Sequence, residues 1–118
     1  MKRSILISVK PKWLSKILNG EKTIEVRKTF PSCEFPVDVY IYCTKDKKYS
    51  YAVCEYQRGK VVAKFTLNKV KTNFVMFGGI VNNKNILSES CIKFEELVDY
   101  LNGSRVFYEW HIEDLEIF

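Results

Sequence analysis

The fold of this chain is decided by residues 7–31, ISVKPKWLSKILNGEKTIEVRKTFP. The apolar run at its start completes a strand predicted over residues 4–9. A proline opens the next segment and a glycine follows it, which predicts a helix over residues 11–19. Apolar and polar residues then alternate over residues 22–29, the pattern of a second strand. The stretch therefore predicts a strand, a helix and a strand in close succession.

The second strand carries an unusual charged face. Ile24 and Val26 point to one side of it, and Glu25 and Arg27 point to the other. Lys22 comes just after the turn, before the regular alternation. A solvated strand face would account for these charges, and so would a polar cleft that holds a ligand.

The remaining sequence predicts mostly strands. Strands are expected at residues 37–43, 51–56, 60–70 and 106–118, the last bent near 113–114, with a hairpin at 57–59, a short helix over 94–101, a loop at 30–36 and a turn at 44–50. Residues 72–88 show no clear pattern. This order is not the regular alternation of a parallel α/β protein. We predict an α+β fold, a small mixed β-barrel with two or three short helices, forming a single domain over residues 1–118.

Composition favours a folded, cytoplasmic protein. The chain has 118 residues, of which 47% are hydrophobic and 14% aromatic, enough for one hydrophobic core. No apolar run is long enough for a membrane span or a secretory signal. The four cysteines form no C-x-x-C pair and the single histidine is distant from them in sequence, so we expect reduced, buried cysteines, no metal site and no cofactor.

Charge is unevenly distributed along the chain. The net charge is +6 over residues 1–30, +5 over residues 31–88 and −6 over residues 89–118. A basic N-terminal part suits a polyanion such as RNA or DNA, because Lys and Arg displace counterions from phosphates. Lysines scattered over the surface for solubility would give the same total.

The sequence resembles the ASCH domain family of the PUA-like superfamily. The resemblance rests on residues 7–31, on the signature G-x-K-x-x-E-x-R within them, and on the later segments VYIYCT, GKVVAKFTLNKV and YEWHIEDLEIF, so it covers nearly the whole chain. It implies a barrel of five or six strands, with the signature residues lining a cleft beside the first helix. It also implies RNA binding, and ribonuclease activity has been attributed to some members.

One bacterial group of the family is similar to an amidohydrolase that deacetylates N4-acetylcytidine. The resemblance aligns the catalytic Lys of that group with Lys22 and its catalytic Thr with Glu25. The group also uses a Glu from a later strand, which has no clear match here. Glu25 thus replaces the expected nucleophile.

The signature residues are the first candidate site. Arg27 can grip a phosphate or a base edge with two parallel hydrogen bonds, or form an ion pair with Glu25, and the two roles are compatible. Lys22 could serve as a point charge for phosphate or as a desolvated base, with Glu25 as its acid–base partner if the protein is an enzyme. A solvated lysine is the alternative.

Two further groups are candidates for nucleic-acid binding. Lys10 and Lys12 flank the start of the first helix, where free N–H groups favour anions, although they could simply keep the helix solvated. Tyr108, Trp110 and His111 offer aromatic rings for stacking and a group that titrates near neutrality. Packing of Trp110 in the core is the alternative that we favour.

Three functions remain open from the sequence. The first is a module that binds single-stranded RNA or a nucleotide through the basic cleft, with no metal and no membrane partner. The second is an enzyme acting on RNA or a modified nucleoside. The third is a phage-encoded protein-binding module that uses the barrel surface to interfere with a host factor.

Overall fold

A computed structural model of the chain describes residues 3–46 and 57–118. These residues form eight strands and three helices. In chain order the elements are β1 (Ser4–Val9), α1 (Pro11–Leu18), β2 (Ile24–Arg27), β3 (Val37–Cys43), β4 (Val61–Leu67), β5 (Val70–Met76), β6 (Gly79–Ile80), α2 (Ile86–Ser90), α3 (Phe94–Leu101), β7 (Val106–His111) and β8 (Glu113–Ile117).

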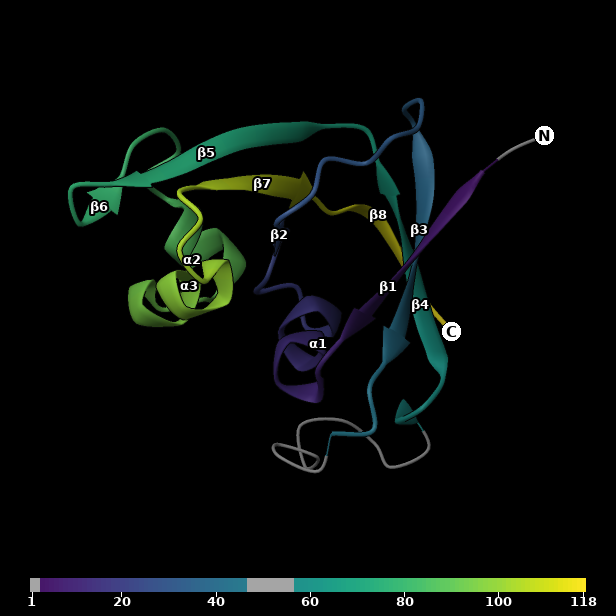
Figure 1. Cartoon of the computed structure of the whole chain (residues 1–118). Coiled ribbons are helices and arrows are strands. Elements are labelled where there is room, and N and C mark those ends of the chain that lie inside the picture. The colour runs from purple at the N-terminus through teal and green to yellow at the C-terminus, as the bar shows by residue number, and fades with distance from the viewer. Residues whose placement is uncertain (1–2, 47–56) are drawn as a thin grey trace.

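The strands make two four-stranded sheets that together curl into a half-barrel (Figure 1). One sheet has the order β1-β3-β4-β8 and the other has the order β2-β7-β5-β6. β1 runs parallel to β3, while the other pairs are antiparallel. Helices α2 and α3 lie below the second sheet in Figure 1, and α1 lies near the end of β1. The predicted α+β class and small mixed barrel are confirmed, with eight strands in place of the five or six expected.

Two long strands of the prediction are each divided between the sheets. The strand expected over residues 60–70 ends at Leu67, and Val70 already begins β5 in the second sheet. The closing strand expected over residues 106–118 is interrupted at Ile112, between β7 and β8. Both corrections have one cause: the chain changes sheets at these points, and alternation of residue types does not show which sheet a residue joins.

Of the other predicted elements, several are confirmed and one strand lies outside the described residues. The first strand, the first helix and the strand at residues 37–43 are confirmed, and so is the helix at 94–101. The strand predicted over 51–56 lies outside the described residues, as does most of the turn at 44–50. The region 72–88, where no pattern was clear, contains most of β5, then β6 and the start of α2.

Two apolar clusters form the core. One lies between the first sheet and α1, and includes Leu14, Ile41 and Phe65 together with Trp110 from β7. The other joins β2 and β7 to α2 and α3, and includes Val26 and Phe107. Because β2 presents its apolar side chains to the second cluster, its alternate residues face the other way, toward α1.

Two further features bear on the sequence-based expectations. Cys33, Cys43 and Cys91 are free thiols, but Cys43 alone of the three is buried, so the expectation of buried cysteines is wrong for the other two. Cys54 lies outside the described residues. None of the helices in residues 3–46 and 57–118 has the length and apolarity needed to cross a bilayer.

A candidate ligand cleft beside the first helix

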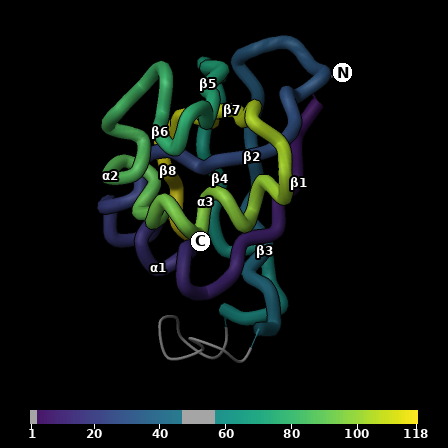
Figure 2. Tube along the Cα trace, turned by 60° about the vertical axis from the view of Figure 1, so that its left-hand side comes forward, coloured from purple at the N-terminus to yellow at the C-terminus, as the bar shows by residue number. Residues whose placement is uncertain are grey.

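A cleft of about 490 Å³ opens between α1, β2 and α3. Figure 2 views the molecule from the side on which α3 lies, with β2 behind it. The residues that line the cleft come from three parts of the chain: Ser8, Val9, Lys10, Trp13, Lys22, Glu25, Val26, Arg27, Ile92, Glu96, Asp99 and Tyr100. The volume is within the usual range for small-molecule sites. The signature residues predicted from the sequence therefore do share a cavity.

The turn after α1 places Lys22 at this cleft. Gly20 has a φ of +85°, a left-handed conformation that costs glycine little, and it reverses the chain at the helix end. The main-chain N–H of Lys22 then donates to the carbonyl of Lys16, 2.9 Å away. The N–H of Thr23 donates to the carbonyl of Glu89 at the same distance, which ties the turn to α2. Lys22 is thus held between two helices before β2 begins.

The side chain of Lys22 is buried, with only 2% of the residue exposed. Its Nζ donates to the main-chain carbonyl of Ser90 at 2.7 Å and lies 3.5 Å from Oε1 of Glu25. Burial lowers the pKa of Lys22 from its usual value, and the charge of Glu25 opposes that shift in part. The alternative of a solvated lysine is excluded for this position.

Glu25 lies between the two cations of the signature. Its Oε2 accepts a hydrogen bond from Nη1 of Arg27 at 3.2 Å, while its Oε1 faces Lys22. The side chain of Glu25 is 10% exposed and that of Arg27 is 29% exposed, so the guanidinium keeps an open edge. The ion pair expected between Arg27 and Glu25 is therefore present, and it leaves Arg27 able to contact a ligand.

The opposite wall of the cleft is acidic. Glu96 and Asp99 of α3 face the signature residues, so part of the acidic C-terminal segment lies at the cleft. Lys12 joins the two walls, because its Nζ lies 2.7 Å from Oε2 of Glu96. This contact is the main cause that lowers the pKa of Glu96. The cleft is consequently mixed in charge, with a basic wall and an acidic one, whereas the sequence predicted a basic cleft around the signature.

Two aromatic rings border the cleft. Trp13 comes from α1 and Tyr100 from α3. Cations lie over both rings: Nζ of Lys12 is 4.5 Å from the centroid of Trp13, and Nζ of Lys28 is 4.9 Å from that of Tyr100. Flat rings beside cations are suited to stacking on a nucleobase whose phosphate is close by.

The aromatic cluster predicted on the last strands is placed elsewhere. Trp110 is buried in the core, and its Nε1 donates to the carbonyl of Thr29 at 3.2 Å. Tyr108 packs edge-on against Phe30, with ring centroids 5.7 Å apart. His111 follows Trp110 on β7 and, by alternation, faces the α2 side. None of the three is among the residues that line the cleft, although Tyr108 pairs with Arg27 and Trp110 pairs with Glu25 across the two strands. The packing of Trp110 in the core is confirmed.

Sequence reasoning also missed residues that shape the cleft. Glu96, Asp99 and Tyr100 lie on a helix that reads as an ordinary amphipathic element, and Trp13 reads as part of the apolar face of α1. Ser90 is buried, and its hydroxyl has no hydrogen-bond partner although its carbonyl holds Lys22. Lys10 and Lys12 stand at or near the cleft as predicted. Across the described part of the chain, no three His, Cys, Asp or Glu side chains are grouped so that they could hold a metal ion.

Comparison with known proteins gives one family. The ASCH domain model matches residues 7–115 of the chain. The structure is similar to that of ASCH from Zymomonas mobilis, with a TM-score of 0.67 and 20% sequence identity over 95% of this chain and 68% of that one. Crystal structures of two mutant forms of that Zymomonas mobilis protein are similar to the same degree. No curated protein matches this sequence.

Proposed function

Because the chain belongs to the ASCH domain family, we propose that its cleft binds single-stranded RNA or a nucleotide. Family membership supports RNA binding as the general role. The structural observation that carries the proposal is the convergence of Lys22 and Arg27 on a cavity bordered by two aromatic rings. A phosphate would lie against the cations and a base against Trp13 or Tyr100.

The acidic wall narrows the choice of ligand. Glu96 and Asp99 would repel a continuous run of phosphates, so the cleft suits one or two nucleotides better than a duplex. Carboxylate oxygens can also accept hydrogen bonds from the amino groups of a base. The proposed arrangement therefore directs phosphate toward β2 and the base toward α3.

A titration with short single-stranded RNA at several salt concentrations tests the proposal. If Lys10, Lys22 and Arg27 together neutralise one or two phosphates, the slope of log Kobs against log salt should lie between about −0.7 and about −1.4. A duplex of the same sequence is the comparison ligand and should bind more weakly. Absence of binding, or binding that does not change with salt, would contradict the proposal.

The burial of Lys22 favours an enzyme as the second candidate function. A lysine whose pKa is lowered by burial in a cleft is a candidate acid–base group, and Glu25 could act as its partner. A deacetylase of the amidohydrolase type would need another nucleophile, because Glu25 stands where that group has Thr.

Product formation from RNA and from a panel of modified nucleosides separates the two candidates. An enzyme should show turnover that Lys22→Ala abolishes while the circular dichroism spectrum is unchanged. A binding module should show no product with any substrate, even at high protein concentration.

A further inference from the structure

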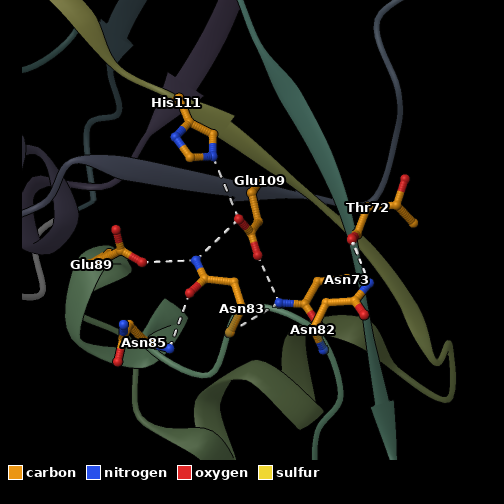
Figure 3. Close-up of polar contacts among 8 residues, drawn as sticks. All are labelled: Thr72, Asn73, Asn82, Asn83, Asn85, Glu89, Glu109 and His111. Carbon is orange, nitrogen blue, oxygen red and sulfur yellow. Dashed lines mark hydrogen bonds and ion pairs between the residues drawn. The ribbon is translucent and has the colours of Figure 1, made fainter.

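A second polar cluster surrounds Glu109 of β7 (Figure 3). By alternation along the strand, Glu109 faces the side opposite to its neighbour Trp110. Glu109 is fully buried, and two asparagine amides donate to its carboxylate. Nδ2 of Asn73 lies 2.7 Å from Oε2, and Nδ2 of Asn83 lies 3.2 Å from Oε1. His111 adds a contact of 3.5 Å between its Nε2 and the same Oε1. A buried carboxylate without such donors would cost several kcal/mol, so the amides are what make its burial possible.

Asn83 connects this carboxylate to α2. Its amide group has two N–H bonds, and the same Nδ2 that contacts Glu109 also donates to Oε1 of Glu89 at 2.8 Å. Its Oδ1 accepts from the main-chain N–H of Asn85, the residue that precedes the helix. Asn83 therefore contacts α2 at both ends, through Asn85 before its first residue and through Glu89 in its last turn, as Figure 3 shows.

Helix α2 depends on such contacts for its position. It has only five residues, Ile86–Ser90, and a helix of this length is unstable unless tertiary contacts hold it. Ile86 anchors its apolar side in the core. The polar side is fixed through Asn83, which is in turn fixed by the carboxylate of Glu109.

The far end of α2 forms part of the cleft. The carbonyl of Ser90 accepts from Nζ of Lys22, and the carbonyl of Glu89 accepts from the N–H of Thr23. A continuous series of hydrogen bonds thus runs from Glu109 through Asn83 and α2 to Lys22. A displacement of α2 would remove the acceptor of the Lys22 amine and let water reach it.

We infer that Glu109 is a positioning residue for Lys22: through Asn83 it fixes α2, and α2 holds the lysine at the cleft. Glu109 lines a separate cavity with Asn82 and Asn83, so it acts on Lys22 only through the helix. The consequence for ligand binding rests on the proposed function, whereas the consequence for Lys22 itself does not.

Asn83→Asp tests the inference with an isosteric change. The new carboxylate cannot donate and is repelled by both Glu89 and Glu109, so α2 should loosen. Because burial is the main influence on Lys22, its pKa, measured by NMR of the side-chain Cε and Nζ nuclei, should rise toward its ordinary value of 10.5. RNA affinity should fall about tenfold.

Asn82→Asp is the matched control. It introduces the same charge one residue away, and Asn82 contacts the carbonyl of Thr72 and the side chain of Asn73, but neither Glu89 nor Glu109. The pKa of Lys22 should stay as in the unaltered protein. Glu109→Gln, which keeps one acceptor oxygen, should give a smaller shift in the same direction as Asn83→Asp and covers the case in which that variant does not fold.

This experiment can contradict the role of Glu109 without contradicting RNA binding by the cleft, and the reverse. An unchanged pKa of Lys22 in folded Asn83→Asp and Glu109→Gln, or an equal shift in Asn82→Asp, would overturn the inference. A shifted pKa with no RNA binding by the unaltered protein would support the inference and count against the proposed function.

Discussion

The amine of Lys22 donates to the main-chain carbonyl of Ser90, 68 residues later in the chain, at 2.7 Å. This bond joins the turn after α1 to the end of α2, and it lies at the edge of the cleft. Both residues are buried, so the lysine carries its charge in a place that water scarcely reaches.

Loss of Arg27 should weaken RNA binding and its dependence on salt. Arg27→Ala removes one phosphate contact, so the slope of log Kobs against log salt should become shallower by about 0.7. Lys64→Ala is the control, because Lys64 pairs with Glu116 on the other sheet. Equal losses in the two variants would indicate that only net charge matters, and would remove Arg27 from the site.

Loss of the ring of Tyr100 should weaken binding without a change in salt dependence. Base–aromatic stacking is worth about 1–3 kcal/mol, so Tyr100→Ala should lower affinity by at least fivefold, while Tyr100→Phe should keep most of it. Tyr40→Ala, at a ring that packs against Phe118 on the first sheet, controls for the loss of a tyrosine. Full affinity in Tyr100→Ala would mean that the base does not reach α3.

Lys22 should make both the stability of the fold and the affinity for RNA change as the pH rises into the alkaline range. Burial lowers the pKa of Lys22 in the folded protein, so the unfolded chain binds more protons between that lowered pKa and 10.5. The contribution of Lys22 to the free energy of unfolding therefore rises as the pH increases through this window. RNA affinity should fall over the same window, because the neutral amine no longer attracts phosphate.

Lys22→Met isolates the effect of this one lysine. The variant should lack that part of the pH dependence, with stability at pH 7 within about 1–2 kcal/mol of the unaltered protein and with weak RNA binding. Urea unfolding at pH 7, 8.5 and 10 measures the first effect and RNA titration the second. Identical pH profiles for the two proteins would show that Lys22 is hydrated.

His111 should make the fold sensitive to mild acid. Burial lowers the pKa of His111 below 6.5, and the charges of Lys69 and Lys71 act in the same direction, while Glu109 opposes them. The unfolded chain then binds more protons just below pH 6.5, so the free energy of unfolding falls as the pH drops through this range.

His111→Gln should reduce this acid sensitivity. Urea unfolding at pH 7.5 and 5.5 gives the loss of stability for each protein, and the unaltered chain should show the larger loss. A larger loss in His111→Gln would indicate that Glu109 stabilises a protonated His111, the reverse of what burial predicts.

Several parts of this structure follow from local sequence. The helix from Pro11 has an apolar face and a glycine at its end, and the strand at residues 37–43 has a strict alternation that survives as alternate buried residues. The signature could also be read as a charged strand face beside this helix. Each of these features depends on residues fewer than about ten positions apart, where periodicity and turn chemistry are informative.

The tertiary structure alone decided which distant side chains meet. Tyr108 and Trp110 suggested a stacking surface, and the register of β7 does pair them with Arg27 and Glu25 of β2. The rings are nevertheless taken up by packing, because Trp110 belongs to the core and Tyr108 packs against Phe30. The second wall comes from α3, whose Glu96 and Tyr100 carry no sequence signal that links them to Arg27. The carbonyl of Ser90 is a main-chain acceptor, which any residue could provide. Sequence patterns report the face on which a side chain lies, but the partner across a cavity depends on how sheets and helices pack, and that is set by the whole chain.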